Sequence, residues 1–186
     1  MSELQPVNAS RILMGVPMPP MLIEGLVPRG SLVMLSSDPS VGKTFVGLEA
    51  ARAVASHTPF IGKFQAWGGR VLFVEEDEPE WALSKQFVKL AGDQNQAERA
   101  ALIAKNPEPL GTMDPTTIEE NLFFLVNQRI SLDTVEGALR LCRAAASLGT
   151  DPEDLGTDLI VLDTLRALHS GDENDSTWMS FILSNL

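Results

Sequence analysis

The chain has 186 residues, a length typical of one domain, and its apolar content of 44% is ordinary for a protein with a packed core. Its 25 acidic and 14 basic residues give a formal net charge of −11, which repels nucleic-acid phosphate on average, and no segment is basic enough to form a binding patch. No apolar run reaches the ~18 residues of a membrane span and no secretion signal is present, so we expect a soluble, cytoplasmic protein.

The first part of the chain is rich in proline and methionine, with Pro17, Pro19 and Pro20 close together. Prolines this dense exclude a long helix, so we expect an N-terminal strap or linker over 1–25 and a folded domain over 26–186. After a turn at 28–30, the apolar run 31–36 predicts a short strand buried on both faces. An alanine-rich stretch without proline then predicts a helix from Lys43 to about Ser56.

Strands and helices alternate along the rest of the chain. We expect strands over 70–74, 122–126 and 158–163, and helices over 79–91, 94–104 and 133–149, with a short helix at the C-terminus. Pro79 suits a first helical turn, and Asp133 with Glu136 three residues later is typical of a capping box. Cys142 lies at helical spacing with apolar neighbours, which predicts a small core residue. This order indicates an α/β fold with a mainly parallel sheet flanked by helices.

The loop between the first predicted strand and helix carries a phosphate-binding pattern. The usual signature is glycine, four residues, then Gly-Lys-Ser/Thr; Gly42, Lys43 and Thr44 fill its last three positions, and Ser37 replaces the first glycine. Backbone N–H groups and the helix N-terminus of such a loop bind anions. We therefore predict that ATP is bound by nine consecutive residues: Ser37, Asp38, Pro39, Ser40, Val41, Gly42, Lys43, Thr44 and Phe45.

Individual residues of this loop have predicted roles. Lys43 reaches the outer phosphates and assists catalysis, and Thr44 places its hydroxyl on Mg²⁺. Because Ser37 replaces the glycine, binding without efficient hydrolysis stays an alternative.

Acidic residues follow two of the predicted strands. Asp163 ends the apolar strand 159–162, and an aspartate there points into the crevice where ligands of parallel sheets bind, so we expect it to hold Mg²⁺ through water. Four acids at 75–78 follow another strand, and one of them can orient the attacking water. Glu76 is the first candidate for this catalytic base and Asp77 the second. The sequence does not fix which of them faces the phosphates.

Four segments together resemble the RepA-type replicative helicase ATPases of the RecA-like P-loop superfamily, the AAA domain ATPases of plasmids and phages. They are LIEGLVPRG at 22–30, DPSVGKT at 38–44, VLFVEED at 71–77, and VLDTLRALH at 161–169 followed by DEND at 172–175. The resemblance covers about residues 15–186. It implies a RecA-like fold, Lys43 and Thr44 on the nucleotide and Mg²⁺, Asp163 near Mg²⁺, and Glu76 or Asp77 as the base. It also implies that Arg166 and His169 lie near the active-site loop or a subunit interface, unless they are plain surface residues.

The resemblance further implies parts that have no counterpart in these residues: a strand between the phosphate-loop strand and the metal-binding (Walker B) strand, a polar sensor, DNA-facing loops and an arginine that reaches the neighbouring subunit. We therefore expect either a domain truncated after the Walker B strand or a sheet completed by a partner chain or by unusual pairing.

The leading functional hypothesis is a Mg²⁺-dependent ATPase, the motor module of a DNA helicase or recombinase-like protein. The complete protein would form a homo-oligomeric ring, with DNA contacts made by other regions. One alternative is a nucleotide-binding or regulatory module that does not hydrolyse ATP. A small-molecule kinase is a weaker third hypothesis, because the sequence shows no arginine-bearing lid.

Overall fold

The computed structural model describes residues 6, 8–15, 18–38, 40–92, 116–149 and 156–171. Pro39, the helix predicted over 94–104 and the C-terminal helix lie outside the described residues. Within them, three parallel strands form a sheet in the order β4–β3–β5, with β4 at Leu122–Val126, β3 at Val71–Glu75 and β5 at Leu159–Asp163. All three strands were predicted, and the α/β fold is confirmed as a small parallel sheet of RecA-like P-loop type.

Strand β3 lies at the centre of the sheet and is buried on both faces. Its five residues are all buried, and they pair in register with β4 on one side and β5 on the other. Val71 and Phe73 belong to one apolar cluster, and Leu72 and Val74 belong to another on the opposite face. This alternation is the period of two that a strand imposes, so each face of β3 requires its own layer of helices.

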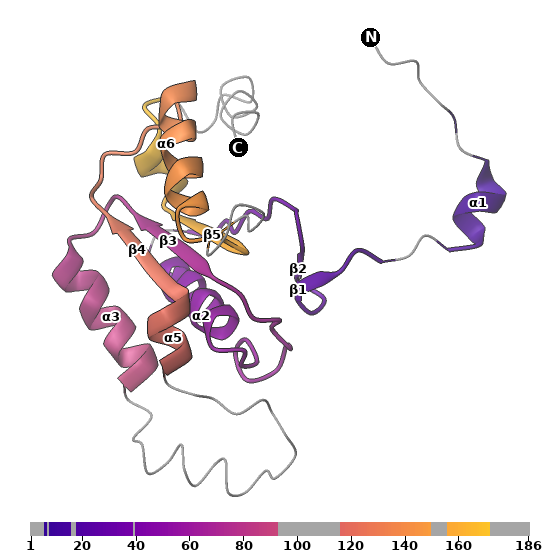
Figure 1. Cartoon of the computed structure of the whole chain (residues 1–186), viewed down its shortest axis with the longest axis horizontal. Coiled ribbons are helices and arrows are strands. Elements are labelled where there is room, and N and C mark those ends of the chain that lie inside the picture. Colours follow the sequence, from indigo (N-terminus) through magenta and orange to yellow (C-terminus); the bar gives the residue numbers. More distant parts are fainter. Residues whose placement is uncertain are drawn as a thin grey trace, which may run out of the picture.

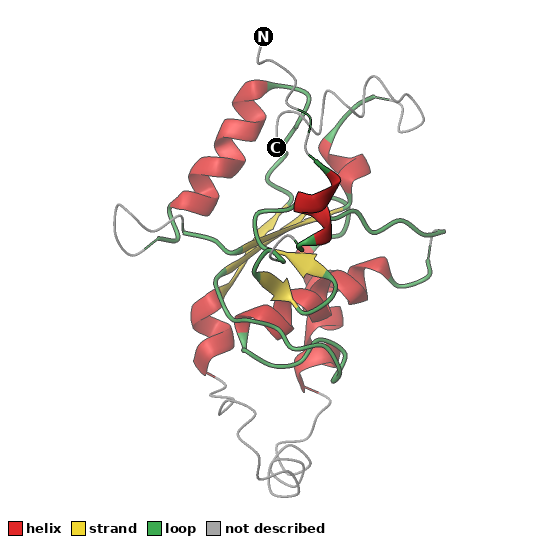
Figure 2. Cartoon of the chain, turned by 90° about the vertical axis from the view of Figure 1, so that its right-hand side faces the viewer, coloured by secondary structure: helices red, strands yellow, loops and turns green. Residues whose placement is uncertain are grey.

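The two layers are visible in Figure 1, where α2, α3 and α5 lie on one side of the sheet and α6 on the other. Figure 2 shows the strands nearly edge-on between the helices. Helix α2 spans Lys43–Ala55 and α3 spans Glu80–Gly92, both close to the predicted bounds. The short helix α5, Thr116–Asn121, was not predicted and leads directly into β4.

Helix α6 runs from Val135 to Ala146, and its N-cap differs from the prediction. The cap is Thr134, whose side-chain oxygen accepts a hydrogen bond from the Gly137 N–H, so the proposed capping box at Asp133 is wrong. Asp133 instead accepts from the N–H of Ser170 at 3.0 Å. Cys142 is exposed, contrary to the prediction, because α6 packs through the face that carries Ala138, Leu141 and Ala145.

The N-terminal segment contributes a small antiparallel hairpin. Strand β1, Met21–Ile23, pairs with β2, Val27–Pro28, and Leu22 and Ile23 are buried in the same cluster as α2. Helix α1, Ala9–Leu13, lies well away from the sheet in Figure 1.

The strand predicted over 31–36 is not formed, and this prediction was wrong. Every residue of the segment is exposed, Leu32 to 61% and Leu35 to 56%. Two residues before the segment, the Arg29 guanidinium donates a hydrogen bond to Asp158 at 2.6 Å, and Asp158 directly precedes β5. After the segment, the chain continues into the loop before α2. No strand in the described part of the chain pairs with this segment, and an apolar run without a partner strand gains no ladder hydrogen bonds and no burial.

Candidate nucleotide-binding site

The candidate site forms where the carboxyl ends of β3 and β5 meet the N-terminus of α2. Glu75 and Asp163 are register partners on neighbouring strands, so their side chains point to the same face. That face is the one covered by α2, because Val71, Phe73 and Val161 share its cluster, and a Cβ added to Gly47 of α2 would lie 3.3 Å from Val161. The fold therefore brings Asp163 to the end of α2 that carries Lys43 and Thr44.

The loop before α2 has the backbone of an anion-binding turn. Gly42 adopts φ 92°, a left-handed conformation that favours glycine, and it precedes α2 without any side-chain cap. Ser40 is also left-handed, at φ 63°. Because no side chain of the described residues accepts a hydrogen bond from the first N–H groups of α2, these groups are available to an anion, and the helix dipole adds to the attraction.

The Lys43 side chain turns back across this loop. Its ammonium donates to the carbonyl oxygens of Ser37 and Asp38, at 2.9 and 3.0 Å. These two hydrogen bonds hold the Lys43 ammonium over the loop, and Lys43 is the residue predicted to bind the outer phosphates. The remaining predicted loop residues Ser37, Asp38, Ser40, Val41 and Phe45 are exposed.

Asp163 is buried, with 7% of its surface exposed. Burial raises the pKa of its carboxyl group, and the negative charge of Asp77 acts in the same direction. A hydrogen bond from the Thr44 hydroxyl and the positive charge of Lys43 lower that pKa and partly oppose the shift. One carboxylate oxygen, Oδ2, is buried and has no hydrogen-bond partner among the described residues.

This arrangement fits a magnesium ion. A buried carboxylate oxygen without a partner is costly, and a cation relieves the cost. The hydroxyl of Thr44 and the carboxylate of Asp163 are hard oxygen donors, which Mg²⁺ prefers. The donor set is small, as expected for an ion that keeps several waters and binds substrate phosphates.

The sequence pattern does not single out Glu75, yet it is the most deeply buried of the four acids at 75–78. Burial raises the pKa of its carboxyl group, while hydrogen bonds from the N–H groups of Glu78 and Asp77 lower it, and the charges of Asp163 and Glu78 raise it. Both hydrogen bonds are 2.8 Å long and end on Oε1. Glu75 therefore caps the turn that follows β3. Its position two residues after the inward-facing Phe73 is the sequence signal that could have indicated a buried carboxylate here.

The two predicted base candidates face different surroundings. Glu76 accepts hydrogen bonds from three backbone N–H groups of the loop after β4, those of Gln128, Arg129 and Ile130. Asp77 is exposed, and its charge acts on Asp163. Lys43, Thr44 and Asp77 thus all lie near enough to Asp163 to act on its carboxyl group, whereas Glu76 binds the β4–α6 loop.

Arg166 and His169 follow β5. Arg166 is exposed in the short 3-10 helix η1, Leu165–Leu168, whereas His169 is buried. Neither ring nitrogen of His169 has a hydrogen-bond partner within the described ranges.

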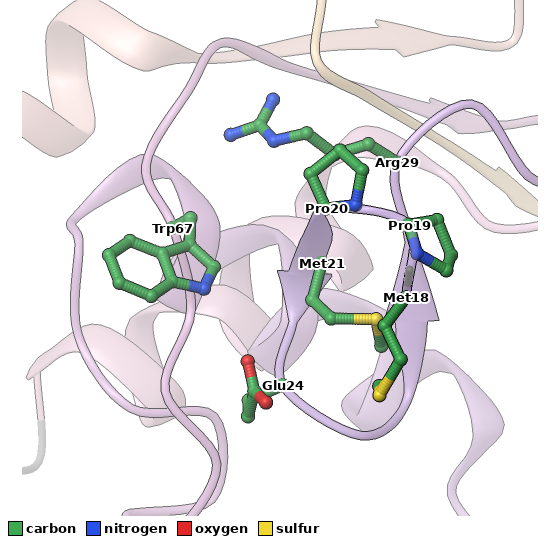
Figure 3. Close-up of a pocket in the computed structure, with 7 residues that line it drawn as sticks. All are labelled: Met18, Pro19, Pro20, Met21, Glu24, Arg29 and Trp67. Atoms are coloured by element: carbon green, nitrogen blue, oxygen red, sulfur yellow. The ribbon is translucent and has the colours of Figure 1, made fainter. Parts of the chain in front are cut away.

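A separate hollow of about 490 Å³ lies on the hairpin and is lined by Met18, Pro19, Pro20, Met21, Glu24, Arg29 and Trp67 (Figure 3). Arg29 ties it to Asp158 at the start of β5, the opposite end of the strand from Asp163. This hollow is therefore distinct from the phosphate loop. Its walls carry one arginine and one glutamate among apolar side chains.

A protein-family model described as AAA domain matches residues 1–186. No curated protein matches the chain. Among the described residues, no helix is both long and apolar enough to cross a membrane.

Proposed function

Since this chain belongs to the AAA domain family of P-loop ATPases, we propose that it binds ATP with Mg²⁺ and hydrolyses it at the site between α2 and β5. The observation that carries the proposal is the buried Asp163 carboxylate, which lies near enough to Thr44 and Lys43 of the phosphate loop for both to lower its pKa, and whose Oδ2 has no hydrogen-bond partner among the described residues. A strand-tip carboxylate beside a phosphate loop is the arrangement that phosphoryl transfer requires.

Each residue has a definite task in this proposal. The N–H groups at the start of α2 and the loop bind the phosphates, and Lys43 exchanges the carbonyls of Ser37 and Asp38 for phosphate oxygens. Thr44 and Asp163 hold Mg²⁺, which when bound neutralises charge that develops on the phosphates. Asp77 accepts a hydrogen bond from the attacking water and orients it, which is supported by the effect of its charge on Asp163 and by its exposure.

Nucleotide titration and phosphate release by wild-type protein test the proposal, with Lys43→Ala as the site variant. We expect Lys43→Ala to lower turnover by roughly 10²-fold or more, because it removes the cation that stabilises the outer phosphates. Lys85→Ala, at an exposed position of α3, is the matched control and should behave as wild type. Turnover that survives in Lys43→Ala, or persists when Mg²⁺ is chelated, would refute the site.

The finer role we propose is that of a motor module in a DNA helicase or recombinase-like protein of RepA type, active in the complete protein as a ring. The four segments that resemble this group support the proposal. The net charge of −11 implies that DNA contacts are made elsewhere. Nucleotide-dependent oligomers and DNA-stimulated turnover are the expected results, and monomers with DNA-independent turnover would argue against a motor.

A nucleotide-binding module without turnover is a second candidate. Ser37 replaces the first glycine of the signature, and the segment 31–36 that leads into the loop is unpaired and exposed. A loop on a loosely held segment can bind phosphate without holding it in line for attack. Tight ATP binding together with no phosphate release would favour this candidate.

A further inference from the structure

The carboxylate of Glu76 is committed to the polypeptide backbone. Oε1 accepts from the N–H groups of Gln128 at 3.0 Å and Ile130 at 3.3 Å, and Oε2 accepts from that of Arg129 at 2.9 Å. An ionised carboxylate offers about four lone-pair positions, so three of them are occupied. Hydrogen bonds to a charged acceptor are stronger than neutral ones, so this clamp holds the loop firmly.

The loop that Glu76 holds has an unfavourable backbone. Asn127 and Arg129 have φ values of 52° and 54°, in the left-handed region that residues with a side chain rarely adopt. Such conformations persist where the surroundings fix them. Contacts from the end of β3 fix them here: the Asn127 N–H donates to the Glu75 carbonyl, the Asn127 side chain donates to the Glu78 carbonyl, and Glu76 binds the next three N–H groups.

The same loop connects the end of β3 to the segment that follows β5. Beyond Ile130, the N–H of Leu132 donates to the carbonyl of Leu168 at 2.7 Å, and Asp133 accepts from the N–H of Ser170. Glu76 itself donates its backbone N–H to the carbonyl of Asp163 at 3.3 Å. Glu76 thus lies at the junction of β3, β5 and the loop after β4, directly before Asp77.

The two faces of the sheet separate Glu76 from the phosphate site. Glu75, the last residue of β3, faces α2, where Lys43 and Thr44 lie. Glu76 follows it and binds the β4–α6 loop, whose Ile130 packs in the apolar cluster on the opposite face of the sheet. A general base must reach the water that attacks the phosphate, and Glu76 is turned toward a different partner.

We propose that Glu76 is a positioning residue: its carboxylate fixes the loop 127–130 and thereby holds the turn at the end of β3, so that Asp77 stays opposite Asp163. The inference deepens the proposed ATPase function and rests on it for the role of Asp77. The hold on the loop does not depend on that function, because it consists of hydrogen bonds between the Glu76 carboxylate and the backbone of the same chain.

The test combines amide hydrogen exchange with ATP turnover in four variants. In Glu76→Ala we expect exchange of the amides of Gln128, Arg129 and Ile130 to rise roughly 10-fold or more, since their acceptor is gone. In Glu76→Gln the increase should be largest at Arg129, because the amide carbonyl can replace Oε1 but the NH₂ group cannot replace Oε2. Turnover should fall in both, less in Glu76→Gln, with ATP affinity unchanged within about threefold.

Two further variants serve as controls. Glu80→Ala, an exposed acid in the first turn of α3, should leave both exchange and turnover unchanged. Asp77→Asn should abolish turnover and leave exchange at 128–130 unchanged. Circular dichroism identifies any variant that fails to fold. If Glu76→Ala does not fold, the exchange and turnover of Glu76→Gln, which preserves the shape of the side chain, test the proposal.

The outcomes separate the possible roles. Loss of turnover in Glu76→Gln with unchanged exchange at 128–130 would overturn the proposal and make Glu76 the base. Unchanged exchange in both Glu76 variants would overturn it as well. If wild-type protein shows no turnover while Glu76→Ala loosens the loop, the proposed ATPase function fails and the hold on the loop stands.

Discussion

Strand β3 and the segment 31–36 consist of the same kinds of residue and end in opposite environments. The sequence VLFV of β3 is fully buried, with Phe73 at 0% exposure, whereas LVML at 32–35 is exposed throughout. Strand β3 has a paired strand on each side and a layer of helices on each face. The segment 31–36 has anchors near its two ends but no ladder within the described chain. An apolar run becomes a buried strand only when its backbone edges are also satisfied.

Amide exchange measures this comparison most directly. The amides of β3 should exchange only through global or near-global opening, so we expect them to be protected roughly 10³-fold or more above those of 32–36. Equal protection of the two segments in solution would show that 31–36 is paired and would break the comparison.

Core truncation gives the next largest effect. Phe73 packs between α2 and Phe124, with the two ring centroids 5.7 Å apart. Phe73→Ala should therefore lower the free energy of unfolding by about 3–5 kcal/mol in urea denaturation. Leu35→Ala, the matched change in the exposed segment, should stay within about 0.5 kcal/mol of wild type. A large loss in Leu35→Ala would reveal burial of that segment.

The buried acid at the end of β3 predicts a pH dependence that the exposed segment cannot produce. Because burial raises the pKa of Glu75, its contribution to folding is fully present below its ordinary value of 4.5 and is lost as the pH rises through the raised value. Glu75→Gln removes the charge and keeps a carbonyl acceptor for the two N–H groups, so stability at alkaline pH should rise relative to wild type. Asp163 contributes a dependence of the same sign, which remains in the variant.

Urea denaturation across mildly acidic to alkaline pH provides the measurement for Glu75. A Glu75→Gln protein that is less stable than wild type at alkaline pH would mean that the hydrogen bonds from Asp77 and Glu78 outweigh the cost of burying the charge.

The anchor of the exposed segment should have the smallest effect. Arg29 and Asp158 form an ion pair in which each side chain is 36% exposed, so Arg29→Ala should cost no more than about 1 kcal/mol of unfolding free energy. Exchange in β3 should not change, while exchange near residue 30 should increase. A loss of unfolding free energy as large as that of Phe73→Ala would mean that the sheet depends on this ion pair for its stability.

Much of the fold could be predicted because local patterns were strong. The strands at 71–75, 122–126 and 159–163 and the helix that begins at Lys43 follow from apolar runs, alanine content and the absence of proline. The N-cap of α6 could not be distinguished, because Asp133 and Thr134 are both good capping residues and the backbone path decided between them. Cys142 has apolar neighbours at helical spacing, but only packing determined which face of α6 is buried.

The candidate site was partly predictable for the same reason. Lys43, Thr44 and Asp163 are fixed by a short motif and by the end of a strand, and the structure brings them together. The roles of the acids at 75–78 depend on side-chain direction beyond the strand end, which spacing alone does not define. Glu75 caps the turn, Glu76 binds the β4–α6 loop, and Asp77 remains exposed near Asp163.

The sequence by itself therefore determined the types of most elements and the phosphate loop, since these depend on residues close together in the chain. Only the tertiary structure decided that the apolar segment 31–36 is not a strand and that Glu76 faces away from the phosphate site. Both outcomes depend on partners distant in sequence, a neighbouring strand edge in one case and the N–H groups of 128–130 in the other. Backbone hydrogen bonds have no side-chain signature, so the residues that would have to supply them cannot be identified from local pattern.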